Sequence, residues 1–396
     1  MKGANLKSLY ESLGPRECVA KLREGMNRGL FKPEDFSLRE LAEAFLGENW
    51  VKRLNPRAVA RYGEVNLLEA GEGVDVSAFS NITGQIFYNK ILEGWTLATK
   101  VSDKLVSTVG TKLDGEKMPW LSHVISEGDS IRPGMPYPEA NFGERYIETP
   151  ATTKYGMIVS VTKEAIFFDL TGQMLRAAGE VGEKLGYNKE KRVLKLVLGL
   201  TNSYKLNGTS YNTYNTSGGW INKAASTPLV DWTSFEQAYV LFSKITDPDT
   251  GLPIQIEPKD VFVMPAKYFT ASRIANATEI ETVYPGYSAS SPSAPGNVKM
   301  TTGNPVPWKM APLTSPIAYQ LLINSGLTDS QAREYWYIGD FKKAFAYMEN
   351  WPLTVTQAPN NNIKEFEQDI VVRYKASERG VPAVIDPRYV AQFYNS

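Results

Sequence analysis

The stretch from residue 144 to residue 200 most constrains the fold, because an extended segment passes directly into an unusually long helical pattern. Residues 154–161 are strand-like, and the hydroxyl of Thr162 can then accept an unpaired backbone N–H of the first helical turn. Apolar residues recur at roughly helical spacing, at Ala165, Phe168, Leu175, Ala178, Val181 and Leu185. About forty residues of helix at ~1.5 Å each would span about 60 Å, so this helix needs a long surface to lie along.

The helical pattern is interrupted at Gly186-Tyr-Asn188, where Asn188 can cap a second helical run. Two interpretations are open: a single long helix forms the backbone of a flat subunit, or two helices bend at Gly186. Because the interruption begins at Gly186, we take this glycine as the candidate flex point of the helix.

The bulk composition is that of an ordinary globular protein. The chain has 396 residues, enough for two or three domains, and 42% of them are hydrophobic. Lys plus Arg and Asp plus Glu number 43 each, so no net charge marks a specialised nucleic-acid or lipid binder. No run approaches ~18 consecutive apolar residues, so we expect no membrane-spanning helix.

The residues that most often carry catalysis or bind metals are scarce. Cys18 is the single cysteine and His123 the single histidine, which excludes an intrachain disulfide, a thiolate zinc cage and a multi-histidine metal site. The chain contains no nucleophile elbow, P-loop or metalloprotease motif. We therefore predict no catalytic residue, cofactor or metal site, and the remaining enzyme alternative is a carboxylate-based enzyme of unknown substrate.

The first part of the chain reads as helical. Residues 1–62 suggest short amphipathic helices, the first of which stops at Gly14-Pro15. They form either an ordinary helical subdomain or an assembly appendage. Residues 63–80 are predicted to be a glycine-containing linker, and residues 82–109 another amphipathic helix.

Residues 111–150 differ from their surroundings, because proline and glycine interrupt every regular pattern there. A structureless loop of this length is unusual inside a compact domain, which favours an arm that projects onto a partner. Its aromatic and arginine residues are of the kind that anchors interfaces, namely Trp120, Arg132, Tyr137, Phe142, Arg145 and Tyr146. The alternative interpretation of this segment is a mobile surface loop.

Strand and helix patterns alternate through residues 201–345, which predicts a mixed α/β region. A capping box beginning at Thr233 is expected to open one of its helices. Near the C-terminus, residues 365–375 alternate between polar and apolar positions, residues 377–380 resemble a turn, and residues 381–385 resemble a returning strand. These three segments predict a long β-hairpin.

This order of elements resembles the HK97-type major capsid proteins of tailed bacteriophages. The first match is residues 149–156 leading into 161–166, which are similar to the descending E-loop strand and the start of the spine helix. The second match is residues 338–341, 369–374 and 378–387, which are similar to the crossover between domains and the closing hairpin. It implies an α+β fold with an N-arm, an extended E-loop hairpin, a long spine helix, a P-domain and an A-domain. The implied boundaries are 1–75 for a helical N-terminal extension, 76–110 for the N-arm and its helix, 111–160 for the E-loop, 161–200 for the spine helix, 201–345 for the A-domain and 346–396 for the return strands of the P-domain.

The resemblance implies a structural role rather than an enzymatic one. Such a protein self-assembles into hexamers and pentamers of an icosahedral head that encloses double-stranded DNA, which it contacts without sequence specificity. The implied partners, besides copies of the chain, are a portal and in some phages scaffolding, protease or decoration proteins. The implied location is the virion capsid, after synthesis in the cytoplasm of a host bacterium.

Two points of the family pattern are open at the level of sequence. The resemblance leaves open whether residues 1–75 act as a scaffolding-like extension of the kind that some relatives remove by proteolysis. Lys112 and Lys117 have no identifiable asparagine partner, so covalent cross-linking is not predicted. The alternative within the same fold is an encapsulin-like compartment that encloses a cargo protein, and the N-terminal extension favours the virion.

Overall fold

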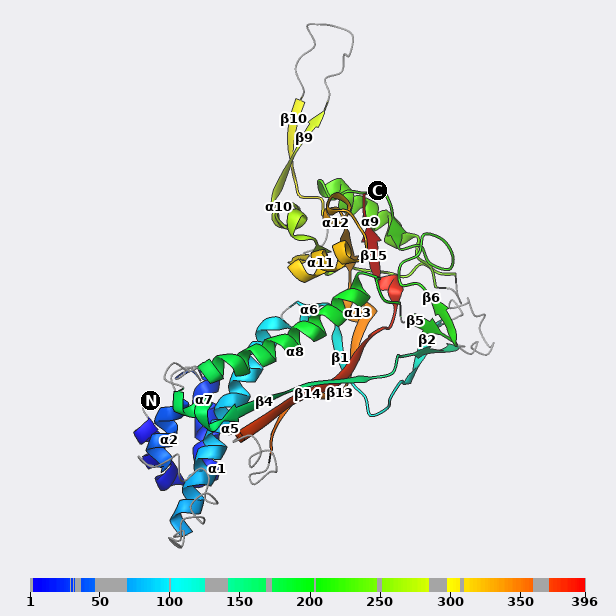
Figure 1. The fold of residues 1–396 in the computed structure, drawn as a ribbon. Helices are drawn as coiled ribbons and strands as arrows, with labels where there is room; N and C mark the ends of the chain where they lie inside the picture. The colour runs from blue at the N-terminus through cyan, green and yellow to red at the C-terminus, as the bar shows by residue number, and fades with distance from the viewer. Residues whose placement is uncertain are drawn as a thin grey trace, which may run out of the picture. The chain divides into compact units, whose positions relative to one another are not determined.

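The protein is described by a computed structural model over residues 3–28, 30, 32, 37–46, 70–99, 101–124, 142–168, 173–202, 204–247, 251–284, 298–306, 310–358 and 370–395 (Figure 1). These residues form two compact units. Unit 1 comprises Met1–Lys100, Thr153–Glu190 and Asn350–Gly380, and unit 2 comprises Val101–Thr152, Lys191–Glu349 and Val381–Ser396. Helices and strands occur in both units, so the predicted α+β class is confirmed.

Unit 1 is mainly helical. It contains α1 (Gly3–Asn27), α2 (Leu38–Leu46), α5 (Ala70–Ala98), α7 (Lys163–Phe168), most of α8 (Gln173–Val197), β4 (Thr153–Thr162) and parts of β13 (Phe345–Gln357) and β14 (Ile370–Val384). The predicted interruption at Gly14 is confirmed, because α1 kinks there with a φ of 77°. The predicted linker at residues 63–80 is wrong in its second half, since α5 begins at Ala70. Adding turns to an existing helix avoids the cost of nucleation, which outweighs the weak preference of Gly71 and Gly73 against helix.

The N-terminal helices share one hydrophobic core with the rest of unit 1. Side chains of α1 and α2 are buried together with side chains of α5, α8, β4 and β14, including Cys18, Leu41, Phe45, Ile86, Leu175 and Tyr374. Phe87 stacks on Tyr374 with ring centroids 4.8 Å apart. Burial also raises the pKa of the Cys18 thiol, which favours its neutral form. These helices therefore contribute directly to the core of unit 1.

The long helical stretch contains two described helices, α7 and α8, and residues 169–172 between them lie outside the described residues. Thr162 does accept a hydrogen bond from the backbone N–H of Ala165 at 3.3 Å, which confirms the predicted cap. However, α7 ends at Phe168 and α8 begins at Gln173, whereas Gly186 and Asn188 lie inside the continuous α8. Of the two interpretations that the sequence leaves open, the one in which Asn188 begins a second helix is therefore wrong.

Close packing against α5 explains the glycines of α8. A Cβ atom at Gly182 would lie 2.0 Å from the carbonyl oxygen of Ile91, and one at Gly186 would lie 2.7 Å from the Cβ of Ala98. On the facing helix, a Cβ at Gly94 would lie 2.3 Å from the carbonyl oxygen of Gly179. The glycines thus let two helix backbones approach. Flexing at Gly186 stays a prediction, and any such motion would have to move α5 as well.

A four-stranded sheet has the order β1-β13-β14-β4, with β1 spanning Ser107–Gly110. The strand β14 runs antiparallel to β4, from Gly380 opposite Thr153 to Ile370 opposite Thr162. The predicted turn at residues 377–380 is wrong, because Ser377 and Glu378 continue the strand. Both of these side chains are buried, and their pairing with β4 outweighs the local turn preference.

Unit 2 is built around a five-stranded sheet of order β11-β8-β12-β15-β7. Alternate residues of β8 and β12 enter two different cores, as the two-residue period of a strand requires. Val261, Val263 and Trp336 join a core with α9 and α10, whereas Phe262 and Tyr337 join a core with α11 and the end of α8. The alternating strand and helix patterns of residues 201–345 therefore predicted the mixed character of this region correctly.

The elements of this sheet and its covering helices are β7 (Lys223–Ala224), α9 (Trp232–Ser243), β8 (Asp260–Val263), η3 (Pro265–Lys267), α10 (Tyr268–Asn276), β11 (Ala311–Thr314), α11 (Pro316–Asn324), α12 (Asp329–Arg333), β12 (Trp336–Gly339), η4 (Pro387–Tyr389) and β15 (Val390–Phe393). The cap of α9 differs from the prediction. Asp231 is the capping residue, and its carboxylate accepts the N–H of Thr233 at 2.9 Å. The helix therefore starts earlier than a capping box at Thr233 would allow.

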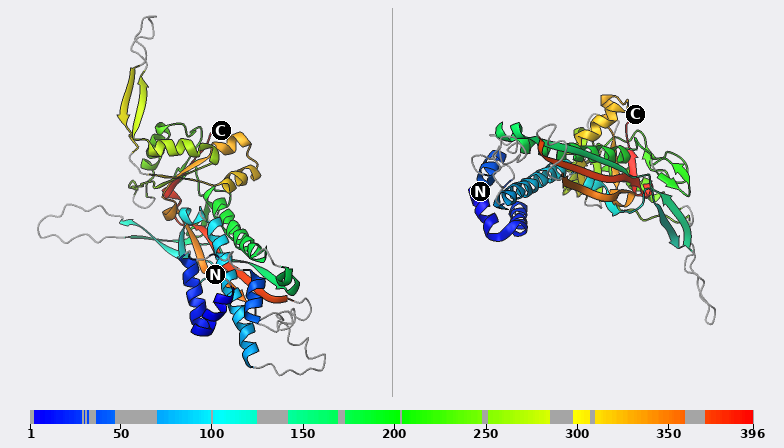
Figure 2. Two further views of the ribbon diagram at one scale, coloured as in Figure 1. Left: turned by 90° about the vertical axis from the view of Figure 1, so that its left-hand side faces the viewer. Right: turned by 60° about the horizontal axis from the view of Figure 1, so that its bottom comes forward.

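The remaining described elements of unit 2 are α6 (Ser102–Leu105), α13 (Phe341–Ala344), the pair β9 (Glu279–Tyr284) and β10 (Val298–Gly303), and a sheet of order β2-β3-β5-β6. The antiparallel β9–β10 pair extends away from the five-stranded sheet (Figure 2). The predicted helix at residues 82–109 ends at Ala98 within α5, and β1 occupies its last positions.

Candidate subunit interface

The predicted arm is a β-hairpin in unit 2. The strands β2 (Lys117–Val124) and β3 (Phe142–Glu148) pair antiparallel, with Trp120 opposite Arg145. The pairing shifts between Leu121 and Val124, which marks an irregularity in the ladder. Of the six predicted interface residues, the hairpin strands carry Trp120, Phe142, Arg145 and Tyr146, whereas Arg132 and Tyr137 lie outside the described residues.

An asparagine–glycine turn holds the base of this hairpin. The strands β5 (Tyr204–Leu206) and β6 (Thr209–Tyr211) are joined by Asn207 and Gly208, both with positive φ. Two positive φ values in a two-residue loop match the twist of the flanking strands. The Oδ1 of Asn207 accepts the backbone N–H of Tyr146 at 3.0 Å, and the N–H of Asn207 donates to the carbonyl of Tyr146 at 3.0 Å.

A second set of hydrogen bonds joins the two ends of the arm. The backbone N–H of Glu116 donates to the Thr149 hydroxyl at 2.8 Å, and the N–H of Thr149 donates to the Glu116 carbonyl at 2.9 Å. The carboxylate of Asp114 accepts both the N–H and the hydroxyl of Thr152, at 2.7 and 2.8 Å. These bonds fix where the chain leaves and re-enters the body of unit 2.

The side chains near the base combine apolar burial with exposed charge. Ile147 is buried in the unit 2 core and pairs with Leu206. The ammonium of Lys117 lies 4.6 Å from the centre of the Tyr146 ring and 3.5 Å from the Glu148 carboxylate. The base is thus held by the core on one side and by charge contacts on the other.

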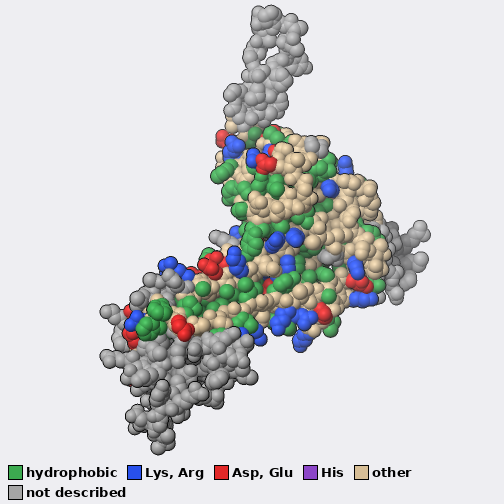
Figure 3. Space-filling view, in the orientation of Figure 1, with side chains coloured by type: hydrophobic (Ala, Val, Ile, Leu, Met, Phe, Trp, Pro, Cys, Tyr) green, Lys and Arg blue, Asp and Glu red, His purple; other side chains and the backbone are tan. Residues whose placement is uncertain are grey.

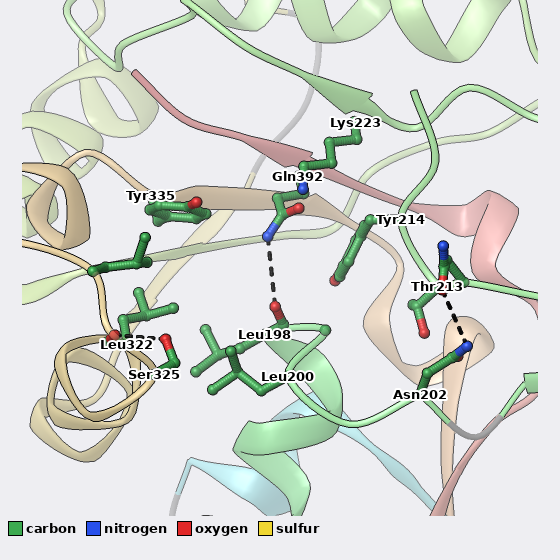
Figure 4. Close-up of a pocket in the computed structure, with 13 residues that line it drawn as sticks. Leu198, Leu200, Asn202, Thr213, Tyr214, Lys223, Leu322, Ser325, Tyr335 and Gln392 are labelled. Atoms are coloured by element: carbon green, nitrogen blue, oxygen red, sulfur yellow. Dashed lines mark hydrogen bonds between the residues drawn. The ribbon is translucent and has the colours of Figure 1, made fainter. Parts of the chain in front are cut away.

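The C-terminal end of α8 is buried in unit 2, and side chains donate hydrogen bonds to its last carbonyls. The Tyr214 hydroxyl donates to the Val197 carbonyl at 2.6 Å, and the Tyr337 hydroxyl donates to the Leu198 carbonyl at 3.4 Å. Gln392 donates to the Tyr337 oxygen at 3.0 Å. It also donates to the Leu198 carbonyl at 3.5 Å (Figure 4). Burial raises the pKa of Tyr214 and of Tyr337 above the ordinary tyrosine value, so both stay neutral hydroxyl donors.

A cavity of about 380 Å³ lies beside this helix end (Figure 4). Its described lining includes the amides of Asn202 and Asn212, the hydroxyl of Tyr335 and the ammonium of Lys223. None of the described lining residues is Asp or Glu. The cavity therefore does not provide the carboxylate pair that the enzyme alternative requires.

A buried ion-pair network holds the returning C-terminal chain in unit 2. The Arg388 guanidinium contacts both carboxylate oxygens of Asp386, at 2.9 and 2.7 Å, and lies 3.5 Å from Asp247. All three residues are buried. Burial alone would lower the pKa of Arg388, but its hydrogen bonds to Asp386 raise it, so the group stays charged. The network explains why these charges are tolerated inside the protein.

Asn222 provides a second polar connection in the same region. Its side-chain amide donates to the carbonyls of Thr213, Pro387 and Val390 at 2.9, 2.9 and 3.0 Å. Its Oδ1 accepts the N–H of Asn215 at 2.8 Å. One fully buried amide thus joins the loop before β7 to the C-terminal strand.

Among the described residues, no group of three His, Cys, Asp or Glu side chains could hold a metal ion. No described helix is long and apolar enough to cross a membrane. The face of the molecule in Figure 3 carries scattered Lys, Arg, Asp and Glu, and its described part shows no continuous basic stripe. His123 lies on β2.

The sequence reasoning missed the residues that hold the arm in place. Asn207 and Gly208 were a readable signal, because an asparagine–glycine pair between strand-forming residues is the strongest short-range hairpin pattern. Asp114 bonds Thr152, 38 positions away. Asn222 bonds Pro387, 165 positions away. No local pattern marks such pairs.

The described residues form an α+β body that carries the β2–β3 hairpin. A family model described as phage capsid protein matches residues 146–393, more than half of the chain. The chain belongs to this phage capsid protein family, and the predicted family is confirmed. Membership indicates a structural rather than a catalytic role.

Solved capsid structures show low sequence identity to the chain. A chain from Gordonia phage Cozz is 12% identical, covers 75% of this chain and 86% of its own, and has a TM-score of 0.42. The cyanophage Pam1 capsid is 10% identical, the match covers 74% of this chain and 90% of the Pam1 chain, and the TM-score is 0.43. The capsid of a native GTA particle is 12% identical, the match covers 75% of this chain and 90% of the GTA chain, and the TM-score is 0.43. No curated protein sequence matches the chain. The family assignment therefore rests on the family model.

Proposed function

We propose that this chain is the major capsid protein of a phage, which self-assembles into hexamers and pentamers of an icosahedral head around double-stranded DNA. Membership of the phage capsid family supports this proposal. The observation that carries it is the β2–β3 hairpin, whose base is fixed by Asn207, Thr149 and Asp114. A hairpin held this firmly at its base suits a contact with a neighbouring subunit.

The energetic argument rests on pre-organisation. Each additional ~400 Å² of apolar surface that the arm buries on a neighbour contributes roughly 10 kcal/mol before the cost of ordering. Anchoring the base in advance lowers that cost, because the base does not have to become ordered on contact. Symmetry repeats the contact in every subunit, so modest pairwise contacts add up to a stable shell.

Contact with packaged DNA is proposed to be weak and independent of sequence. The chain carries equal numbers of basic and acidic residues, and non-specific DNA binding depends on neutralised phosphates. The further partners proposed are a portal and, where the phage uses them, scaffolding, protease or decoration proteins. The proposed location is the capsid of the virion, after synthesis in the host bacterial cytoplasm.

Electron microscopy and sedimentation of the purified chain test this function. We expect capsomers or shells in the wild-type protein. Replacing residues 125–141 with a short Gly-Ser turn removes Arg132 and Tyr137 but keeps both strands of the arm. We expect this variant to keep its unfolding transition and to lose closed shells. Normal shells from the variant would contradict the role of the arm, and a strictly monomeric wild type under all conditions would contradict the capsid function.

The contents of purified particles separate the virion from a cargo compartment. Particles from infected or induced cells are expected to contain nuclease-sensitive, double-stranded DNA. A single enzyme in place of DNA would instead support the encapsulin-like alternative. A saturable small-molecule activity in a monomeric protein would support the enzyme alternative.

A further inference from the structure

An aromatic side chain projects from unit 2 into solvent on α10. Phe269 is 76% exposed, the highest fraction among the described large hydrophobic side chains. Arg273 lies one helical turn further on, which places both side chains on the same face of α10. The neighbouring Tyr268, in contrast, packs against the core under the five-stranded sheet. We call Phe269 and Arg273 the α10 knob.

An apolar groove lies elsewhere on unit 2, along α9. It has a volume of about 500 Å³, and its walls are formed by Trp232, Phe235, Tyr239, Ile256 and Val306. Tyr239, which forms one of these walls, is 56% exposed. A volume of this size accommodates an aromatic side chain. We call this feature the α9 groove.

Two carboxylates line the α9 groove. Glu236 lies on α9 and Glu257 precedes β8, and both are exposed. Among the described residues, neither glutamate forms an ion pair, and Arg273 of the α10 knob forms none either. The knob thus presents an apolar group with a positive charge, and the groove presents apolar walls with negative charges.

We propose that the α10 knob of one subunit docks into the α9 groove of a second copy of the same chain. Phe269 enters between the apolar walls, and Arg273 pairs with Glu236 or Glu257 of that copy. Because the knob and the groove are different surfaces, the contact is head-to-tail and leaves one free knob and one free groove for further copies. Such a contact builds a ring where the rotation between neighbouring copies closes. The inference therefore rests on the self-assembly proposed above.

Charge reversal tests the contact in the full-length chain. One variant carries Arg273→Glu, and a second carries both Glu236→Lys and Glu257→Lys. We expect each variant to need a protein concentration about tenfold higher or more to form capsomers, measured by sedimentation velocity. The chain that carries all three substitutions is expected to recover most of the wild-type assembly. Phe269→Ser is expected to weaken assembly without lowering the unfolding midpoint, because the side chain is exposed.

Disulfide trapping gives an independent reading. With Phe269→Cys and Tyr239→Cys in one chain, oxidation of capsomers is expected to produce a ladder of covalent multimers, while Cys18 stays unreactive in the core. Three outcomes would overturn the inference. Arg273→Glu and Phe269→Ser could assemble like the wild type, the triple variant could assemble no better than its parents, or the ladder could be absent. Wild-type protein that forms no capsomers would instead overturn the proposed function, so the two failures are distinguishable.

Discussion

The side chain of Asn207 accepts the backbone N–H of Tyr146 at 3.0 Å, while the backbone N–H of Asn207 donates to the Tyr146 carbonyl. One residue of a tight turn thus satisfies both polar backbone groups of a residue in the arm. Tyr146 lies one position before the buried Ile147, so this exchange joins the exposed hairpin to the core of unit 2. The relationship makes Asn207 a position where a small change should loosen the arm.

Asn207→Ala is expected to lower the free energy of unfolding by about 1–3 kcal/mol, because it removes an acceptor and places alanine at a φ of 49°. Faster hydrogen exchange at Tyr146 should accompany the loss. Urea unfolding of the subunit measures the first effect and exchange mass spectrometry the second. Asn276→Ala serves as the control, since among the described residues that exposed amide bonds only the nearby Ser272. Equal behaviour of the two variants would show that Asn207 does not hold the arm.

Gly182→Ala should force α5 and α8 apart, because its Cβ would lie 2.0 Å from the carbonyl oxygen of Ile91. Overpacking of this kind costs about 1–3 kcal/mol, or more where backbone has to move. The measurement is the midpoint of chemical unfolding. Gly110→Ala is the matched control, since a Cβ there meets nothing within 4 Å. A neutral Gly182→Ala would mean that the two helices are not closely packed in solution.

Arg388→Met should strongly destabilise unit 2, because it leaves the carboxylates of Asp386 and Asp247 buried without their partner. Removing one member of a buried ion pair costs about 3–5 kcal/mol. Thermal unfolding at neutral pH measures the loss. The exposed pair of Arg333 with Asp329 provides the control, and Arg333→Ala should change the unfolding free energy by less than about 1 kcal/mol. Similar costs for both variants would contradict the burial of the network.

Asp260 should make stability depend on pH. Burial, and then the neighbouring Asp340, raise the pKa of Asp260 above its ordinary value of 3.8, while Lys342, Lys104 and Lys259 oppose the rise. Since the folded-state pKa is raised, the ionised carboxylate destabilises the folded state at neutral pH. This destabilisation is relieved as the pH falls through the folded-state pKa towards 3.8.

The substitution Asp260→Asn isolates this effect. The variant should be more stable than the wild type at pH 7, and the difference should shrink as the pH falls towards 4. Urea unfolding of both proteins at a series of pH values gives the comparison. A constant difference between the two curves would show that ionisation of Asp260 does not contribute.

Several local features followed directly from the sequence. The stop at Gly14 was confirmed as a kink, the strand pattern of residues 154–161 became β4, and the hydroxyl of Thr162 caps α7. Each depends on residues within one helical turn or one strand, where allowed dihedral angles and the nearest hydrogen-bond partners decide the structure. The resemblance to phage capsid proteins also held, because it rested on an ordered set of such local features.

Errors arose where distant segments compete with local preference. Gly186 interrupts the apolar pattern, yet α8 continues through it, because the glycine lies against α5 from almost a hundred residues earlier. Residues 377–380 resemble a turn, yet pairing with β4 keeps them extended. A tertiary contact worth a few kcal/mol outweighs local preferences of about 1 kcal/mol or less.

The sequence by itself determined the α+β class and the family, because these depend on hydrophobic period, turn residues and their order along the chain. Only the tertiary structure decided what holds the arm and the helices in place. Three contacts join residues about 60 to 165 positions apart. They are the bond of Asn207 to Tyr146, the bond of Asn222 to Pro387 and the approach of Gly182 to Ile91. Such pairs leave no periodic trace in the sequence, since they depend on the whole path of the folded chain.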